Sequence, residues 1–197
     1  MQRPAAAATA AAATGDTAAA QQPPQPQPLP PYYQLSLPVY SLATVGRDGG
    51  SPTMNLVTYA SPISLKPRCY ALGLYEGTLS RENMLATEYG VLQLLGEHHA
   101  PLFQLLGRTS GRDVDKLAAL EAAGVPVTRR EPDGIPLLAD SCGWIELRFS
   151  SEPANYGDHE VVICEVTGWH TPPAEELAAA GRRPLYTGHL RELGLLP

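Results

Sequence analysis

Short segments rich in β-branched and aromatic residues, each bounded by glycine, proline or other turn residues, recur along this chain of 197 residues. Residues 38–45 and 51–60 flank the turn sequence Arg47-Asp48-Gly49-Gly50, and this arrangement predicts a β-hairpin. In residues 145–149 apolar and polar side chains alternate, as in a strand that buries one face. Two more strands are predicted at residues 69–75 and 159–169.

The apolar run at residues 90–96 is bounded by glycines and fits a buried strand, although a turn of helix has the same pattern. About six strands are therefore expected. Residues 61–67 hold the pairs Ser61-Pro62 and Lys66-Pro67, which predict a corner between two strands.

Helices are expected between the strands, from about Thr78, over residues 98–107, from Ser110 to a cap at Gly124, and near residues 173–180. This order of elements predicts a mainly β fold, a small barrel with helical decorations, rather than alternating βαβ units. The patterns GxGxxG and GxxxxGK are absent, so the sequence does not support a Rossmann or P-loop phosphate site.

Alanine, proline and glutamine dominate the first 31 residues, with eleven, seven and five copies. Such a segment has no apolar face to bury, so residues 1–31 are predicted to form a disordered leader before a single domain at residues 32–197. The leader is poor in acidic residues and is either an organelle transit peptide or a low-complexity tail without an address. The location is therefore open between the cytoplasm and, for a transit peptide, a plastid or mitochondrion.

Charge and residue spacing exclude several classes of function. The chain has 14 Lys and Arg against 20 Asp and Glu, without a basic cluster on any predicted element, which argues against a nucleic-acid surface. No run of 18 apolar residues exists, so no membrane-spanning helix is expected. The separated Cys69, Cys142 and Cys164 are expected to be reduced thiols, with Cys142 in a strand. The adjacent His98 and His99 would diverge on a helix, with no further ligand at metal-binding spacing, so no metal site is predicted.

The segment LYEGTLSRENM, residues 74–84, passes from a predicted strand into a predicted helix and is the best candidate for an anion site. Free backbone N–H groups at the helix start favour a phosphate, the hydroxyls of Thr78 and Ser80 can donate to it, and Arg81 can add a charge-assisted bond. The alternative is that Thr78 or Ser80 merely caps the helix and Arg81 points to solvent.

Residues 53–61 mix small polar and apolar side chains in one strand. A planar heterocycle such as an isoalloxazine ring needs a flat apolar surface and hydrogen-bonding groups along one edge. Asn55, Thr58 and the strand-end amides near Ala60 and Ser61 can provide both. An ordinary sheet strand is the alternative.

His159 follows Gly157-Asp158 at the start of a predicted strand. An imidazole at this point can hydrogen-bond a bound flavin or nicotinamide, which makes His159 the only candidate for a catalytic residue in the sequence. The alternative is a turn histidine without a chemical role.

Taken in order, several segments resemble those of the flavin reductase-like FMN-binding proteins, over residues 38–194. They are PVYSLATV, SPTMNLVTYASPISLKP, ALGLYEGTLSRENM, GRDVDKL, IPLLADSCGWIELR, NYGDHEVVICEV and RPLYTGHLRELG. The resemblance implies a split β-barrel that forms a homodimer and binds FMN at or near the subunit interface. It implies that Thr78, Ser80, Arg81 and Asn83 hold the phosphate, and that Asn55, Thr58, Tyr59, Ala60 and Ser61 surround the ring.

Members of this family commonly transfer a hydride from NADH or NADPH to flavin and pass reduced flavin to a partner monooxygenase. The resemblance therefore predicts an NAD(P)H-dependent flavin reductase with FMN as cofactor. A non-catalytic FMN carrier or redox sensor on the same fold is the alternative, because no residue marks a nicotinamide site. The pyridoxamine-phosphate-oxidase branch of split barrels is more distant, since it calls for a stronger basic phosphate cluster.

Overall fold

A computed structural model of the chain describes residues 30–197, apart from the side chain of Asp48. The chain divides into two units, residues 1–33 and 34–197, and the architecture below is that of the second. Almost all of the predicted leader, and with it the question of a transit peptide, lies outside the described residues. No helix in the described part is long and apolar enough to cross a membrane.

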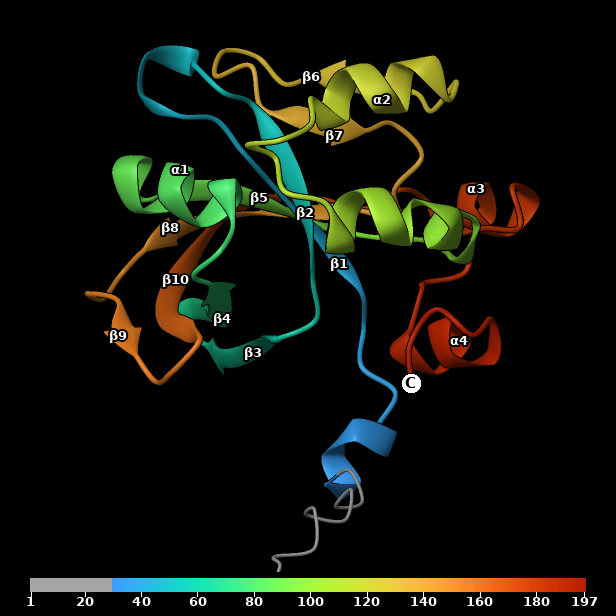
Figure 1. Cartoon of the computed structure of the whole chain (residues 1–197), viewed down its shortest axis with the longest axis horizontal. Coiled ribbons are helices and arrows are strands. Elements are labelled where there is room, and N and C mark those ends of the chain that lie inside the picture. Colours follow the sequence, from blue (N-terminus) through green and yellow to red (C-terminus); the bar gives the residue numbers. More distant parts are fainter. Residues whose placement is uncertain (1–29) are drawn as a thin grey trace, which may run out of the picture. The chain divides into compact units, whose positions relative to one another are not determined.

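One antiparallel sheet of eight strands organises the second unit (Figure 1). Its strand order is β2-β1-β5-β8-β10-β4-β3, and the short β9 pairs with β10 outside this path. The bounds are β1 Tyr40–Thr44, β2 Thr53–Val57, β3 Ala60–Leu65, β4 Arg68–Tyr75, β5 Tyr89–Leu94, β8 Trp144–Phe149, β9 Ala154–Asn155 and β10 His159–His170. A separate two-stranded sheet pairs β6 Val127–Arg129 with β7 Pro136–Leu138.

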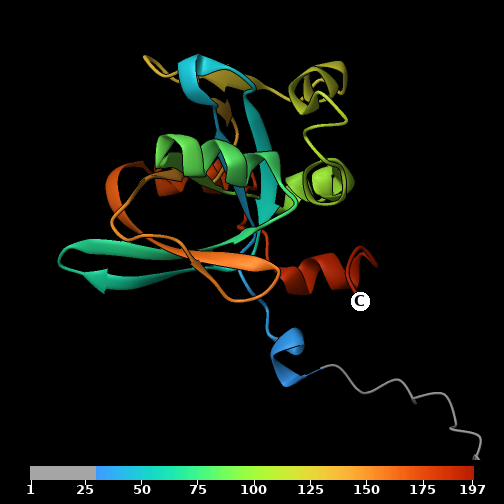
Figure 2. The same cartoon turned by 60° about the vertical axis from the view of Figure 1, so that its left-hand side comes forward.

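The helices lie before, between and after these strands. They are the short turns η1 Pro31–Gln34 and η2 Arg47–Gly49, the helix α1 Leu79–Thr87, the 3-10 helix η3 Glu97–Leu102, the π-type helix η4 Gln104–Arg108, and the helices α2 Lys116–Ala122, α3 Ala174–Ala179 and α4 Thr187–Glu192. Figure 2 shows the hairpin of β3 and β4, in teal, extending away from these helices.

The sheet has a hydrophobic cluster on each face. Leu42 belongs to a cluster formed by the sheet strands themselves, together with residues such as Leu72 and Leu147. The next residue, Ala43, belongs to the other cluster, which includes residues of η3, η4, α2 and α4. The curled sheet therefore closes around one core and carries helices on its other face, which is the predicted mainly β split barrel with helical decorations.

Most predicted elements are confirmed. The hairpin of residues 38–45 and 51–60 is β1 and β2, with Tyr40 opposite Val57. The run at 90–96 is the strand β5 and not a turn of helix. Strands are also present where residues 69–75, 145–149 and 159–169 predicted them, as are helices in 98–107 and 173–180 and one beginning after Thr78.

Three local predictions are wrong at least in part. The corner predicted over residues 61–67 is limited to the turn Lys66-Pro67, because residues 60–65 are the strand β3; Pro62 is tolerated there since β3 is an edge strand. The helix expected from Ser110 begins only at Lys116, because Asp115 is its N-cap and accepts the N–H groups of Leu117 and Ala118. Cys142 lies in the turn before β8 and not in a strand.

Asp140, between β7 and β8, joins two imidazoles that sequence reasoning left without a partner. Its carboxylate lies 2.9 Å from Nε2 of His99 and 3.2 Å from Nε2 of His98. The sequence holds no further ligand at metal-binding spacing, but in the fold a residue about forty positions away closes the cluster. One ligand atom from each of the three residues lies within 4.8 Å of the others.

The hydrogen bonds of His99 favour a structural role, in which His99 and Asp140 link two segments of the chain, over a metal site. Nδ1 of His99 accepts the backbone N–H of Gly96 (3.0 Å), so Nε2 carries the proton and donates it to Asp140. A metal on Nε2 would need that proton removed while Nδ1 remained unprotonated, which a neutral imidazole does not allow. The absence of a metal site stays a prediction.

We expect Asp140→Ala to lower the free energy of unfolding by about 1–3 kcal/mol at neutral pH, because it leaves the buried N–H of His99 without an acceptor. The hydrogen bond from His99 lowers the pKa of the Asp140 carboxyl below its ordinary value of 3.8. The stabilisation is therefore complete above that value and is lost as the pH falls through the lowered pKa. Urea unfolding across the pH range measures it.

Asp113→Ala is the matched control, since Asp113 is exposed and no side-chain bond is found for it in the described part of the chain. It should change stability by less than about 0.5 kcal/mol. Equal stability of the two variants would contradict the role given to Asp140.

Candidate functional site

A cavity of about 390 Å³ lies beside β2, the start of α1 and the segment that joins η4 to α2. Its size is within the range of small-ligand sites. It is lined by Thr53, Asn55, Leu56, Tyr75, Thr78, Leu79, Ser80, Leu106, Gly107, Arg108, Thr109, Ser110, Gly111, Lys116 and His159. The structure thus brings together four predicted site residues, namely Asn55, Thr78, Ser80 and His159.

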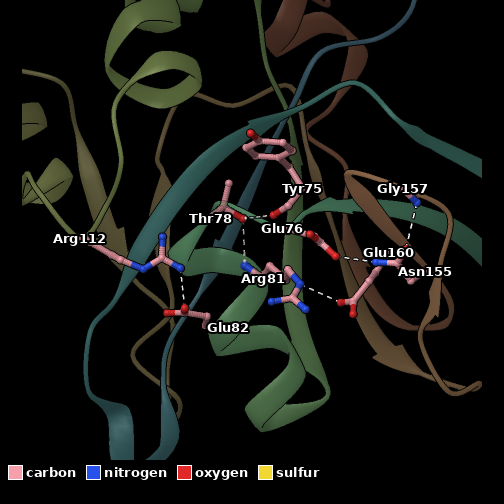
Figure 3. A network of polar contacts seen from close by, with 9 residues as sticks. All are labelled: Tyr75, Glu76, Thr78, Arg81, Glu82, Arg112, Asn155, Gly157 and Glu160. Carbon is pink, nitrogen blue, oxygen red and sulfur yellow. Dashed lines mark hydrogen bonds and ion pairs between the residues drawn. The ribbon is translucent and has the colours of Figure 1, made fainter.

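The turn from β4 into α1 forms one wall of the cavity (Figure 3). Thr78 is the N-cap of α1: its hydroxyl accepts the backbone N–H of Arg81 (3.2 Å) and donates to the carbonyl of Tyr75 (3.0 Å). Thr78 therefore caps the helix, as the alternative considered from the sequence has it. Its hydroxyl proton is already used in the hydrogen bond to Tyr75. A phosphate at this helix start would rely on other donors.

Ser80 provides such a donor. Its side chain is 1% exposed, and its Oγ has no hydrogen-bond partner in the described part of the chain. A buried polar atom without a partner costs free energy, which a ligand that accepts its proton would recover. Because Ser80 also stands in the first turn of α1, an anion there would meet both the hydroxyl and the positive end of the helix.

A second unpaired atom lies on β2. The side-chain nitrogen of Asn55 donates to the carbonyl of Leu56 (3.1 Å), whereas its Oδ1 is buried without a donor. Of the three buried side-chain atoms that lack a partner in the described residues, two line this cavity, and the third, Oγ of Ser41, does not. The cavity is therefore built for a ligand that both accepts and donates hydrogen bonds.

The end of η4 and the start of α2 supply the cations, and the segment between them makes a close backbone approach. Lys116 is 4% exposed, its Nζ donates to the carbonyl of Leu106 (3.1 Å), and burial lowers its pKa to about 8. It thus remains largely charged at neutral pH and retains two further N–H donors. At Gly111 a Cβ would stand 2.7 Å from Oγ1 of Thr53, so only glycine lets this backbone lie against β2.

Sequence reasoning missed this segment because it assigned residues from Ser110 onward to a helix. The run Gly107-Arg108-Thr109-Ser110-Gly111 carries a usable signal: two glycines enclose one cation and two hydroxyls, as in loops that bind anions. Arg112 then fastens the loop to α1, donating to the carbonyl of Gly77 (2.7 Å) and to the carboxylate of Glu82.

Two predicted phosphate ligands have other partners. The guanidinium of Arg81 turns to Glu160 of β10, with Nε 2.7 Å from Oε2, as Figure 3 shows. Arg81 follows Ser80 and is rotated by about 100° from it around the helix, so both cannot face the cavity. Asn83 is buried and donates to the carbonyl of Ser51 (2.8 Å), which ties α1 to the connection between β1 and β2. Neither residue lines the cavity.

The residues predicted around the ring separate into two groups. Asn55 lines the cavity, whereas Thr58, Ala60 and Ser61 do not. Tyr59 is not among the lining residues either, but its ring centroid lies 5.1 Å from that of His159.

His159 lines the cavity and stands between two aromatic rings. Tyr59 packs against it from the connection between β2 and β3, and Tyr75 from the end of β4 with centroids 5.3 Å apart. Nδ1 of His159 lies 2.7 Å from the Asp158 carboxylate, and this hydrogen bond lowers the pKa of Asp158. Both tyrosines are about half exposed, and their rings are tilted by 56° and 53° against the imidazole, so a planar group can stack on one exposed ring.

The sequence model of the flavin reductase like domain matches residues 32–192. The chain belongs to this family. Its match therefore covers all of the described fold except the last residues.

This flavin reductase like domain is 29% identical over 136 residues to an NADH:FMN oxidoreductase from Rhodococcus erythropolis. The alignment covers 68% of the chain and 65% of that relative, so the chain spans just under two thirds of the curated relative's length.

Two solved structures share the split barrel. An FMN-binding protein from Thermus thermophilus with bound p-hydroxybenzaldehyde has a TM-score of 0.63 at 19% identity, over 83% of this chain and 86% of that one. A nitrilotriacetate monooxygenase component B homologue from Mycobacterium thermoresistibile has a TM-score of 0.59 at 21% identity, over 72% of each chain. At such identities the likeness concerns the fold.

In this flavin reductase like domain we expect Ser80→Ala to raise the free energy of unfolding of the ligand-free protein by about 1 kcal/mol, because a buried hydroxyl without a partner is removed. Ser41→Ala should do the same, since Ser41 is equally buried and unpaired. Addition of FMN should then stabilise the parent and Ser41→Ala more than Ser80→Ala. Urea unfolding with and without FMN measures both effects, and equal stabilisation of the two variants would contradict a ligand at Ser80.

Proposed function

We propose that this protein is a flavin reductase that binds FMN in the described cavity and reduces it with a hydride from NADH or NADPH. The observation that carries the proposal is the pair of buried, unpaired atoms, Oγ of Ser80 and Oδ1 of Asn55, in one cavity with a buried ammonium. Membership of the flavin reductase family and the relative named NADH:FMN oxidoreductase support the same activity.

The donor set of the cavity fits the two ends of FMN. Its phosphate would be held by Ser80 and the free N–H groups at the start of α1, with Ser110 and the charge of Lys116 on the opposite wall. Asn55 would accept an N–H from the pyrimidine edge of the ring through its unpaired Oδ1. In this proposal Arg81 and Asn83 hold α1 in place through their bonds to Glu160 and Ser51 and do not bind the phosphate.

The remaining work of the protein is orientation. Bound FMN supplies the hydride acceptor, so the chain needs no general acid or base for the transfer itself. The half-exposed rings of Tyr59 and Tyr75, both tilted against His159, offer aromatic faces beside the cavity on which a nicotinamide can be aligned. Asp158 orients the imidazole by its hydrogen bond to Nδ1, which makes His159 a positioning residue in this proposal.

The test uses the full-length protein purified without added flavin. We expect FMN to bind with a measurable change in its absorption spectrum, and NADH or NADPH to be oxidised faster when FMN is present. Binding without turnover would favour a carrier or redox sensor on the same fold. A protein that binds no FMN and oxidises neither nicotinamide would contradict the proposal.

A monooxygenase that consumes reduced flavin is the partner we propose for this reaction. The fold is shared with a protein named as component B of a monooxygenase, which supports such a pairing. The half-exposed rings leave a route by which reduced flavin can depart.

The hairpin of β3 and β4 is the surface through which we propose that two copies of the chain pair. Leu65 is 83% exposed, Ile63 is 52% exposed, and both lie on the edge strand β3. Trp169 of β10 is also exposed and lies under the guanidinium of Arg68, 4.9 Å from the ring centroid. Apolar side chains along an open sheet edge are stabilised when a second copy covers them.

We expect the parent protein to sediment as a dimer and the double variant Ile63→Asp with Leu65→Asp to sediment as a monomer, because two charges would be buried in the interface. Leu193→Asp is the control, since Leu193 is exposed to a similar degree but follows α4. A monomeric parent protein, or a dimer unaffected by the double substitution, would contradict this interface.

A further inference from the structure

Two cations line the cavity at different depths. Lys116 is almost fully buried, whereas Arg108, the last residue of η4, is exposed. In the described part of the chain no carboxylate forms an ion pair with Arg108, although acidic residues outnumber basic ones. Arg81 and Arg112 beside the cavity are both paired with glutamates. Arg108 is thus the cavity's uncompensated surface cation.

Phe103 holds this cation in place. The guanidinium of Arg108 lies over the ring of Phe103, 5.4 Å from its centroid, and Phe103 itself is buried. Stacking on a fixed ring leaves the N–H groups at the guanidinium edge free and reduces the freedom that binding would cost. A planar guanidinium held in this way suits two parallel hydrogen bonds to phosphate oxygens.

The position of Arg108 along β2 separates it from the phosphate end of the cavity. Gly111 lies against Thr53 and Leu79 at the start of α1, where the FMN phosphate is proposed to bind. Gly107 lies against Leu56, with 3.5 Å between the position of a Cβ and Cβ of Leu56. The loop therefore runs along β2 from Leu56 towards Thr53, and Arg108 stands near the end that holds Asn55 and not at the start of α1.

From this placement we infer that Arg108 binds the pyrophosphate of the nicotinamide donor, which lies outside the cavity while FMN fills it. The inference rests on the proposed function. A cavity of about 390 Å³ suits one nucleotide, so NAD(P)H has to approach the bound FMN from outside, where the exposed guanidinium of Arg108 meets its phosphates. The pyrophosphate of FAD includes the FMN phosphate, which is proposed to bind at the start of α1 and not beside Arg108, and FMN and riboflavin lack a pyrophosphate.

The experiment compares Arg108→Gln with the parent protein in the full-length chain. Dissociation constants are measured for riboflavin, FMN and FAD, and KM and kcat for NADH and NADPH at saturating FMN. We expect unchanged affinity for riboflavin, FMN and FAD, and a rise of about tenfold to a hundredfold in KM for the nicotinamide donor. The value of kcat should stay within about twofold, because the bond between Arg108 and the pyrophosphate is equally strong in the ground state and in the transition state of hydride transfer.

Arg148→Gln is the matched control. Arg148 is also exposed and stacks on a tyrosine, 5.1 Å from the centroid of Tyr89, but it does not line the cavity. Its substitution should leave all of these constants unchanged. Arg108→Lys should recover part of the lost affinity, since lysine restores the charge but not the paired hydrogen bonds.

The two ligand arms test the placement of Arg108: an effect on KM alone supports binding of the nicotinamide donor, whereas weaker binding of FAD with an unchanged KM would place the flavin pyrophosphate at Arg108 and overturn the inference. Equal weakening of FMN and of the dinucleotides would make Arg108 a ligand of the mononucleotide phosphate and overturn the inference. So would unchanged constants in a parent protein that binds FMN and oxidises NADH, which would leave the proposed function intact. A parent protein that binds neither flavin nor nicotinamide would overturn both.

Discussion

The central strands of the sheet bury side chains on both faces, and the remaining elements are arranged around this double burial. Leu42 and Ala43 on β1, like Val91 and Leu92 on β5, point into opposite clusters. A polar side chain on these strands would have to be buried in one of two apolar cores, at a cost of several kcal/mol without a partner. The few polar side chains buried on these strands, such as Gln93, which accepts the backbone N–H of Leu138, are enclosed by the protein. The ligand cavity lies instead at the edge of the sheet and at the segments that join it to the helices.

The cavity follows from this constraint. It lies beside the edge strand β2, which has a neighbouring strand on one side only. It also lies next to the turn that enters α1, where backbone N–H groups remain free. Ser80 and Asn55 keep atoms there that the folded chain does not satisfy, and Lys116 keeps a buried charge with one hydrogen bond. Each of these features lowers the stability of the empty protein and is explained by a ligand that completes it.

Sequence reasoning succeeded where the information is local. Alternation in residues 145–149, the Asp-Gly turn before β2 and the threonine that caps α1 depend on neighbours within a few residues. It failed where two local signals compete or where a distant residue decides. Asp115 and Ser110 are both possible caps for the start of α2, whereas Asp140 reaches His99 across about forty positions. Pro62 reads as a corner because nothing in its surroundings reveals that β3 is an edge strand.

The candidate site divides in the same way. From the sequence alone came the fold class, the family likeness and four residues that line the cavity, because a strand that turns into a helix carries its own signature in Thr78 and Ser80. Only the tertiary structure separated Ser80 from Arg81, since Glu160 on β10 takes the guanidinium, and only it brought Arg108 and Lys116 to the same cavity. Periodicity and turn chemistry act over a few residues, whereas the partner of a charged side chain is chosen by how distant strands and loops pack together.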